Sequence, residues 1–161
     1  MYLWNIQELK KVLMLDQLSE KYKFCYLFIN MLLFAVFTDI SLFSPTEVTK
    51  VDKINSIIGI VIQSIGLITA FKMNGGSDGK EFLTRCTSLY VSLSVRFIVY
   101  TFVFLVLNMA FMALLSFLLP NKYLGDISNA IDMAFVPVLE IVFFWRLAIH
   151  IRDVSKGQLK A

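Results

Sequence analysis

The feature that most constrains this chain is a polar segment, KMNGGSDGKE at residues 72–81, that separates two long apolar runs. It is the longest strongly polar break between Phe24 and Ile151, and it contains three of the seven glycines. Apolar runs of this length predict helices that cross a bilayer, because a crossing helix needs about 20 consecutive, mostly apolar residues. We therefore expect residues 72–85, called the hinge below, to join two such helices.

Composition supports a membrane protein. Apolar residues make up 58% of the chain and the mean hydropathy is +0.72, whereas soluble domains average about 45–50% apolar residues. Fifteen Phe, six Tyr and two Trp suit lipid-facing surfaces and interfacial belts. A length of 161 residues leaves room for one domain, residues 1–161. We predict an all-α, polytopic integral membrane protein whose four transmembrane helices form an up-down bundle.

Four segments have the length and composition of a transmembrane helix: residues 24–43, 54–71, 86–119 and 128–149. The third exceeds what a hydrocarbon core of about 30 Å requires, so its first turns are expected to project from the bilayer as a stalk. Pro45 ends the first span, because proline lacks a backbone donor. Residues 122–126 are expected to form a tight turn before the fourth span.

The two ends of the chain lie outside the predicted spans. Residues 1–23 form an amphipathic leader, in which apolar side chains such as Leu3, Ile6, Leu9 and Leu13 recur at helical spacing. We expect this leader to lie on the bilayer surface, and the alternative is a helix that binds a partner. Residues 150–161 are expected to form a charged, soluble tail.

Positive charge is concentrated on one side of the predicted membrane. The side with the leader, the hinge and the tail carries Lys10, Lys11, Lys21, Lys23, Lys72, Lys80, Arg85, Arg146, Arg152, Lys156 and Lys160. The opposite side carries Lys50, Lys53 and Lys122. Because short loops rich in Lys and Arg stay in the cytoplasm, both termini and the hinge are predicted to be cytoplasmic.

The second span carries a stripe of small and polar side chains at spacings of three and four residues: Ser56, Gly59, Gln63, Gly66 and Ala70. Small residues let helices approach closely in lipid. We interpret the stripe as a packing seam and not as pore lining, because Gln63 is its only strongly polar member. Such a seam fits a contact within or between subunits, and we expect a homo-oligomer.

Polar side chains within the spans are the first group of candidate functional residues: Gln63, Arg96, Asn108, Asp132 and Glu140. Glu140 lies near mid-bilayer, where a charge costs about 2.5–3.5 kcal/mol or more. It is expected to be protonated, paired or exposed to a wet cavity. Two interpretations stay open: Glu140 lines an ion path, or it pairs with Asn108, Gln63 or an arginine.

Charged residues on the cytoplasmic side are the second group, as candidates for binding a partner: Lys72, Lys80, Glu81, Arg85, Arg152 and Lys156. The first four belong to a glycine-rich loop that can move on two rigid helices, and such loops are common recognition sites. The alternative is a turn that only connects two helices.

No motif indicates catalysis, and none indicates a metal or a cofactor. The sequence GGSDGK resembles a phosphate-binding loop, but it is one residue short and Glu81 stands where Ser or Thr would coordinate magnesium. Cys25, Cys86 and His150 do not form a metal-ligand set. We predict a protein that is not an enzyme and needs no cofactor.

The motif NGGSDGKEFLTRCTSLYVSLSVR at residues 74–96, the four-helix layout and the charged end RLAIHIRDVSKG resemble the small transmembrane subunit of the two-gene Kiwa anti-phage defence system. The resemblance implies a homo-oligomer in the bacterial inner membrane that senses phage infection. It also implies a cytosolic DNA-binding protein as partner, with no direct binding of nucleic acid by this chain. It supplies no catalytic residues.

Two functional hypotheses follow. The first is a non-enzymatic, oligomeric sensor or scaffold of the inner membrane that docks a cytosolic effector in anti-phage defence. The second is a small ion channel or transport subunit with Glu140 in its pathway. A membrane enzyme ranks a distant third, because the sequence contains no Ser/His/Asp set, catalytic carboxylate pair or HExxH motif.

Overall fold

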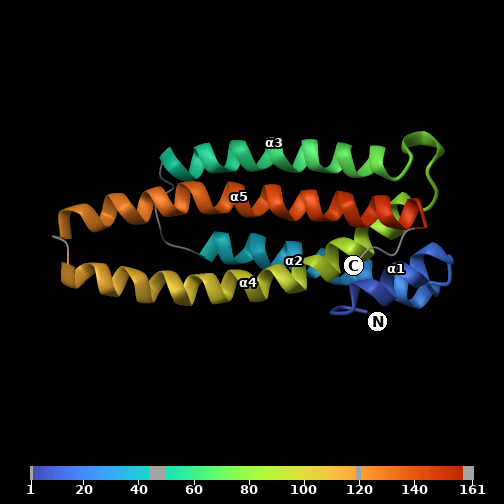
Figure 1. The fold of residues 1–161 in the computed structure, drawn as a ribbon, viewed down its shortest axis with the longest axis horizontal. Helices are drawn as coiled ribbons and strands as arrows, with labels where there is room; N and C mark the ends of the chain where they lie inside the picture. Colours follow the sequence, from blue (N-terminus) through green and yellow to red (C-terminus); the bar gives the residue numbers. More distant parts are fainter. Residues whose placement is uncertain (1, 44–49, 119–120, 158–161) are drawn as a thin grey trace.

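The computed structural model describes residues 2–43, 50–118 and 121–157. Within these ranges the chain forms α1 (Ile6–Met14), α2 (Glu20–Phe43), α3 (Lys50–Met73), the 3₁₀ turn η1 (Gly76–Asp78), α4 (Phe82–Leu118) and α5 (Asn121–Ser155), as Figure 1 shows. No strand occurs in the described ranges. The all-α prediction is confirmed.

The four long helices alternate in direction (Figure 1). α2 and α4 run away from the end of the molecule that holds α1, and α3 and α5 return to it. We call the end formed by α1, residues 74–81 and the last turns of α5 the cap end. The opposite end is called the hairpin end, because α4 and α5 extend furthest there.

Three helices contain stretches long and apolar enough to cross a membrane: Asp52–Met73 in α3, Phe82–Phe117 in α4 and Met133–Ser155 in α5. Large apolar side chains on them are exposed, including Ile60 at 65%, Phe102 at 66% and Phe117 at 87%. Soluble proteins rarely expose contiguous apolar patches larger than a few hundred Å². The chain is therefore a multi-pass membrane protein.

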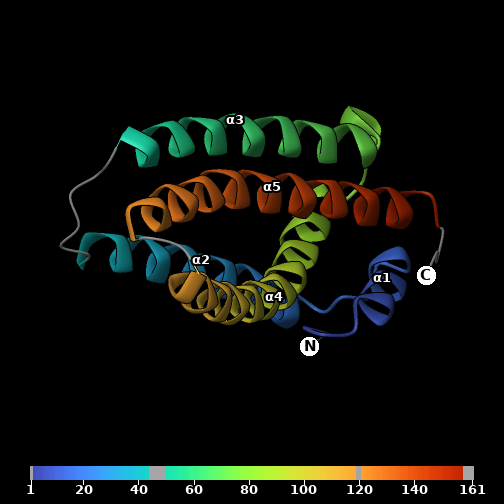
Figure 2. The same cartoon turned by 60° about the vertical axis from the view of Figure 1, so that its left-hand side comes forward.

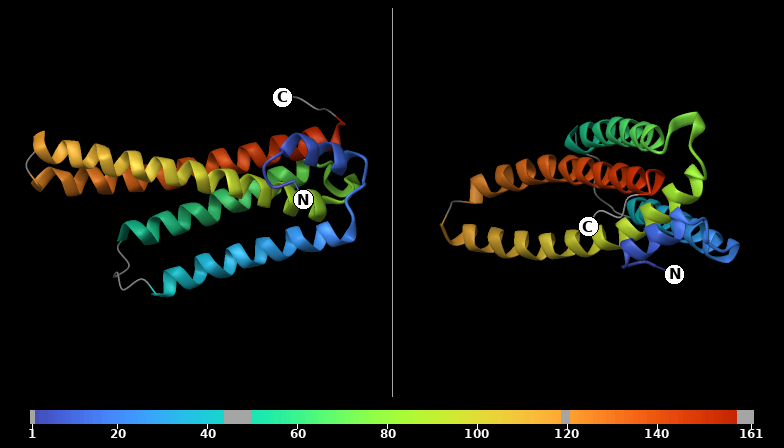
Figure 3. Two further views of the ribbon diagram at one scale, coloured as in Figure 1. Left: turned by 90° about the horizontal axis from the view of Figure 1, so that it is seen from below. Right: turned by 45° about the vertical axis from the view of Figure 1, so that its right-hand side comes forward.

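Two contacts fix the register of α3 against α5, which run in parallel. The Ser155 hydroxyl donates a hydrogen bond to the Met73 carbonyl at 2.9 Å, and the Glu140 carboxylate lies against Gly59. Continuing this register places residues 121–130 beyond the start of α3, a projection of about 15 Å at ~1.5 Å per residue. Figure 3 shows α4 and α5 reaching past α2 and α3 at the hairpin end.

The predicted stripe of small residues on α3 packs against α5, in the most extensive contact between two helices of the described chain. A Cβ atom added to Gly66 would lie 2.4 Å from Phe144 Cγ, so the Phe144 ring fills the space that a side chain at position 66 would need. Ala70 is completely buried. The interpretation as a packing seam is confirmed for Gly59, Gly66 and Ala70, which pack within one subunit. Ser56 and Gln63 of the predicted stripe are exposed.

Helix boundaries differ from the prediction at both ends of α5. Residues 122–126, expected to form a turn, are helical, because α5 begins at Asn121. A single Gly125 lowers helix stability by only about 1 kcal/mol relative to Ala, which does not end a long helix. At its other end, α5 continues to Ser155 and buries Ile151 and Val154. Residues 150–155 of the segment expected to be a soluble tail are therefore part of the helix, and residues 158–161 lie outside the described residues.

The N-terminal leader contains α1, which packs against α4 and α5 and lies beside their cap ends in Figure 2. Ile6, Leu9 and Leu13 are buried, as the amphipathic spacing predicts. Asn5 caps the helix by accepting a hydrogen bond from the Glu8 amide at 3.2 Å. The expectation that the leader only lies on the bilayer is wrong, because other helices of the chain cover its apolar face.

Candidate functional site

The cap end holds the main buried core of the described chain, to which α1, α2, α4 and α5 all contribute. Leu9, Leu89, Leu147 and Ile151 are completely buried there, as is Tyr26 of α2. Fully buried Ser88 and Ser92 of α4 belong to the same region. This part of α4 was expected to be a free stalk, but it forms the centre of a packed cap.

A buried ion pair joins α1 to α5 in the cap. Lys10 Nζ lies 2.8 Å from Asp153 Oδ2, and the two side chains are 1% and 3% exposed. Arg152 Nη2 donates to the other carboxylate oxygen of Asp153 at 3.4 Å. Sequence reasoning missed this pair, because Lys10 was assigned to the solvent face of the leader. Its spacing, four residues after Ile6 and three before Leu13, places it on the apolar face and was the available signal.

Residues 2–4 contact the cap through a second set of polar interactions. The Tyr2 amide donates to the Tyr26 hydroxyl at 2.8 Å, and the Ser92 hydroxyl donates to the Tyr2 carbonyl at 3.1 Å. Arg96 donates to the Trp4 carbonyl, and its guanidinium lies 5.5 Å from the centroid of the Trp4 ring. Arg96, predicted as an intramembrane polar residue, thus anchors the N-terminal segment.

The hinge is a closed turn built around Asn74, whose side chain is buried. Asn74 Nδ2 donates to the Lys80 carbonyl at 3.1 Å and Arg85 Nη1 donates to Asn74 Oδ1 at 3.1 Å. A Cβ atom on Gly79 would lie 2.4 Å from the Asn74 carbonyl oxygen. Gly75 has a φ of +105°, a conformation that glycine adopts without steric cost. The hinge is therefore a closed turn with internal hydrogen bonds, and the expectation that it moves on its two helices stays a prediction.

The six residues predicted to bind a partner fall into two groups. Lys72, Lys80, Glu81 and Lys156 are exposed at the cap end. Arg85 and Arg152 are half-buried, and each makes a hydrogen bond within the protein, to Asn74 and Asp153 respectively. Only the first group offers charge to a partner.

The charged surface of the cap also contains a small cavity of about 490 Å³ between the end of α1 and the hinge, lined by Met14, Leu15, Asp16, Lys80, Glu81 and Arg85. Glu81 lies 3.8 Å from Lys23 Nζ, which also contacts Glu20 at 2.9 Å. These carboxylates, Glu20 foremost through its hydrogen bond, raise the pKa of Lys23 above its ordinary 10.5. The cavity carries charges of both signs, which gives it no preference for one kind of ion.

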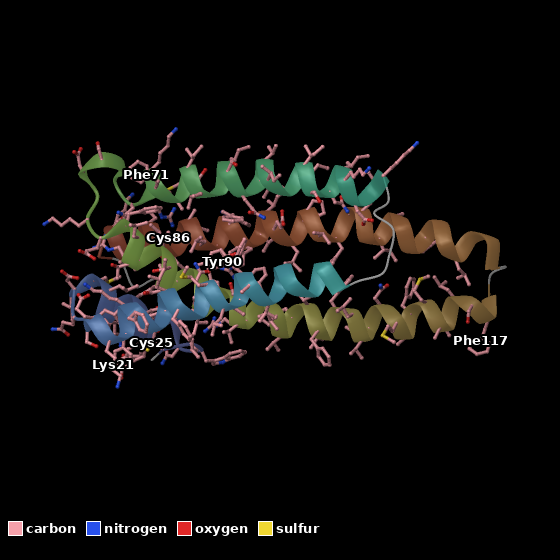
Figure 4. All side chains as sticks on the ribbon, turned by 180° about the vertical axis from the view of Figure 1, so that it is seen from behind. Lys21, Cys25, Phe71, Cys86, Tyr90 and Phe117 are labelled. Carbon is pink, nitrogen blue, oxygen red and sulfur yellow. The ribbon has the colours of Figure 1, made fainter. Side chains whose placement is uncertain are left out.

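A second and larger site lies at the level of the predicted membrane. A groove of about 1370 Å³ opens between α2, α4 and α5, with Gln63 of α3 at its floor. Five polar or ionisable side chains share its mostly apolar wall with Tyr90: Asn30, Gln63, Ser94, Thr101 and Glu140. Tyr90, labelled in Figure 4, is the lining residue of α4 nearest to the cap end. The groove combines residues far apart in the sequence.

Glu140 is the half-buried acid of this groove. Its Oε2 atom is inaccessible and has no hydrogen-bond partner among the described residues. A pairing with Asn108 is excluded by the register: Phe104 stacks on Phe135 at 3.6 Å, which places Asn108 roughly 13 Å along the axis from Glu140 at ~1.5 Å per residue. No arginine forms an ion pair with Glu140 in the described part of the chain. Asp132 lies on α5, and its side chain is outside the described residues.

Other candidates for chemistry give no site. Among the described residues no group of three or more His, Cys, Asp and Glu side chains could hold a metal ion. Cys25 is half-buried and Cys86 is buried, and both are free thiols near the cap end in Figure 4, far from Phe117 at the other end. Neither cysteine faces a partner that would activate it in the described structure.

Comparisons with known proteins found no similar chain: no family model, no curated protein and no solved structure matches this sequence or fold. The resemblance to the Kiwa transmembrane subunit stays a prediction from the sequence.

Proposed function

We propose that the protein is an oligomeric scaffold of the bacterial inner membrane that docks a cytosolic protein through its cap end. One observation carries the proposal. The fold of the cap is secured by buried polar contacts, while Lys72, Lys80 and Lys156 are exposed on its surface and form no ion pair with another described residue. Charged side chains on a rigid support are suited to recognition, because binding does not need to order the surface first.

The proposed topology has four spans, with α2 as the fourth. Its described part exposes large apolar side chains, among them Phe24, Met31 and Phe34. With α2 spanning, α1, the hinge and the end of α5 all face the cytoplasm. A reporter inserted at Ser77 or after Gly157 should then read as cytoplasmic, and a periplasmic signal at either site would overturn the topology.

The partner proposed for this surface is a protein with an acidic face, because Lys72, Lys80 and Lys156 are exposed there and form no ion pair among the described residues. The resemblance to Kiwa adds the proposal that this partner is a DNA-binding effector in anti-phage defence. Docking through surface charge also implies that binding weakens as salt rises, since exposed charges are screened over about 10 Å at 0.1 M ionic strength.

The test is a charge-reversed variant, K72E/K80E/K156E, compared with the parent in co-purification from native membranes. The variant should insert and elute as the parent does, but lose a partner that the parent retains at low salt. Lys53→Glu, an exposed lysine at the start of α3, is the matched control and should keep the partner. Equal recovery with the parent and the triple variant would show that the cap lysines are not the docking surface.

A small transport subunit is the second candidate, and the groove with its unpartnered Glu140 favours it. An acid at membrane depth is expensive and usually serves an ion or substrate pathway. Reconstituted liposomes provide the test: transport by the parent that disappears in Glu140→Gln would support this function. Flux that is identical in protein-free liposomes would rule it out.

A further inference from the structure

The groove between α2, α4 and α5 contains a carboxylate that the protein leaves without a donor. Oε2 of Glu140 is inaccessible to water and accepts no hydrogen bond from the described residues. A buried polar atom without a partner destabilises the protein, and the effect is greater for a charged group. Oε2 itself lies against Gly59, but Glu140 lines the groove, so a ligand that carries positive charge into the groove would stabilise the carboxylate through its charge.

Aromatic rings form much of the groove wall: Phe28, Phe34, Tyr90, Phe97, Phe102 and Phe143. Three of them hold one another in place, because the Phe143 ring packs edge-on against Tyr90 at 4.9 Å and against Phe97 at 5.1 Å. The faces of aromatic rings attract cations, more strongly where water is excluded. The aromatic wall therefore attracts a positively charged ligand, as the carboxylate does.

No lysine or arginine lines the groove in the described structure. The nearest candidate by sequence on α4, Arg96, is engaged with the Trp4 carbonyl and ring at the cap. Glu140 is the one acidic lining residue among those described. The groove thus lacks an internal counter-ion for this acid.

We propose that the groove binds a lipophilic organic cation, with Glu140 as its counter-ion. A volume of about 1370 Å³ is larger than a typical small-molecule pocket of roughly 300–1,000 Å³ and accepts a bulky ligand. Met31, Phe34 and Phe102 line the groove and are exposed. The ligand therefore enters sideways from the lipid, where an apolar cation accumulates, and not from the cap.

Gly59 of α3 positions the acid. A Cβ atom at this position would lie 3.1 Å from Glu140 Oε2 and 3.3 Å from Oε1, closer than ordinary contact. The bare glycine backbone lets the carboxylate rest against α3 at the floor of the groove. Gly59→Ala should shift the carboxylate by a few tenths of an ångström and weaken ligand binding less than removal of its charge does.

The test uses two ions of matched shape and opposite charge, tetraphenylphosphonium and tetraphenylborate, with the full chain in nanodiscs of uncharged lipid. The parent should bind the phosphonium saturably and show no saturable binding of the borate. Glu140→Gln should weaken phosphonium binding about tenfold or more, since it removes the only charge among the described lining residues of the groove. Glu140→Asp keeps the charge and should retain most of the affinity, and Glu81→Gln, at the cap, should leave it unchanged.

A second variant keeps the proposal open to refutation if Glu140→Gln does not fold. Ala35→Trp, on the exposed side of the groove in α2, should block phosphonium binding by filling the entrance. Equal binding of both ions would mean that the groove takes up apolar molecules or acyl chains without regard to charge. That result, or full affinity in Glu140→Gln, overturns the proposal. The assay contains no cytosolic protein, so its failure leaves the docking proposal of the cap unaffected.

Discussion

The cap and the membrane-level groove share helices α2, α4 and α5, but side chains are buried in the cap and exposed at the level of the groove. In the cap, α4 buries Ser88, Leu89 and Ser92 completely, and a buried ion pair links α1 to α5. A few turns further along the same helix, Tyr100, Phe102 and other side chains are exposed. The cap resembles the core of a soluble domain, whereas the remainder of the bundle is open and apolar.

This difference shows that the two regions are stabilised by different interactions. Lipid tails are as apolar as leucine, so helices within a bilayer gain little from the hydrophobic effect and depend on close packing. The α3–α5 seam with Gly66 is of that kind. The cap, in contrast, encloses the Lys10–Asp153 ion pair and the hydrogen bonds of Tyr2, Tyr26 and Ser92, and such contacts favour a single geometry. Four variants test this comparison, ordered from the largest expected effect to the smallest.

The largest effect is expected from Lys10→Met, which leaves Asp153 buried with only the longer contact to Arg152. Removing one partner of a buried ion pair typically costs about 3–5 kcal/mol, and we expect a loss near the lower limit because Arg152 remains. The measurement is the free energy of unfolding in detergent. Lys11→Met, which breaks the exposed pair with Glu8 at 2.8 Å, is the control and should cost roughly 0.5 kcal/mol or less. Similar losses in both variants would contradict a structural role for the buried pair.

The second prediction concerns the seam. Gly66→Ala places a methyl group against the Phe144 ring, whose nearest atom lies 2.4 Å from the new Cβ position. The helices must separate, and overpacking of this kind costs about 1–3 kcal/mol. In Gly125→Ala nothing lies within 4 Å of the new atom, so the better helix propensity should stabilise α5 by up to ~1 kcal/mol. Opposite signs of the two changes in thermal unfolding are expected. A stabilised Gly66→Ala would place the seam elsewhere.

The third prediction tests the closed hinge. Asn74→Ala removes the hydrogen bonds to the Lys80 carbonyl and to Arg85. Two bonds at about 0.5–1.5 kcal/mol each predict a loss of roughly 1–3 kcal/mol. Hydrogen exchange of residues 74–81 should accelerate, while Ser77→Ala, in the exposed part of the same hinge, should leave it unchanged. Exchange at the parent rate in Asn74→Ala would show that the hinge is held by its glycines alone.

The smallest effect on stability is expected from changes to the cap lysines, which are proposed to bind the partner. Lys72→Glu and Lys80→Glu together change exposed charges, so the free energy of unfolding should move by no more than about 1 kcal/mol. A loss larger than that of Asn74→Ala would mean that these lysines support the fold of the cap and are not a free surface.

Several features of the fold could be read from the sequence. The 3.6-residue period of Ile6, Leu9 and Leu13 gave the buried face of α1, and the spacing of Gly59 and Gly66 gave the seam. Both are local patterns, because residues three or four apart on a helix share one face. The apolar runs predicted membrane-crossing helices, and three of them are long and apolar enough in the described structure.

The sequence by itself determined the class of protein, since apolar stretches of this length are stable only as helices in lipid. It did not determine whether lipid or protein covers each apolar helix face. A pattern of apolar residues requires an apolar environment, but lipid and protein both provide one. The tertiary structure therefore decided that α1 packs on α4 and α5, that Lys10 pairs with Asp153, and that Glu140 lies unpaired in a groove. Each of these joins residues of different helices, separated by 143 positions in the case of Lys10 and Asp153. No local period reaches so far, and only the packing of the helices brings these residues together.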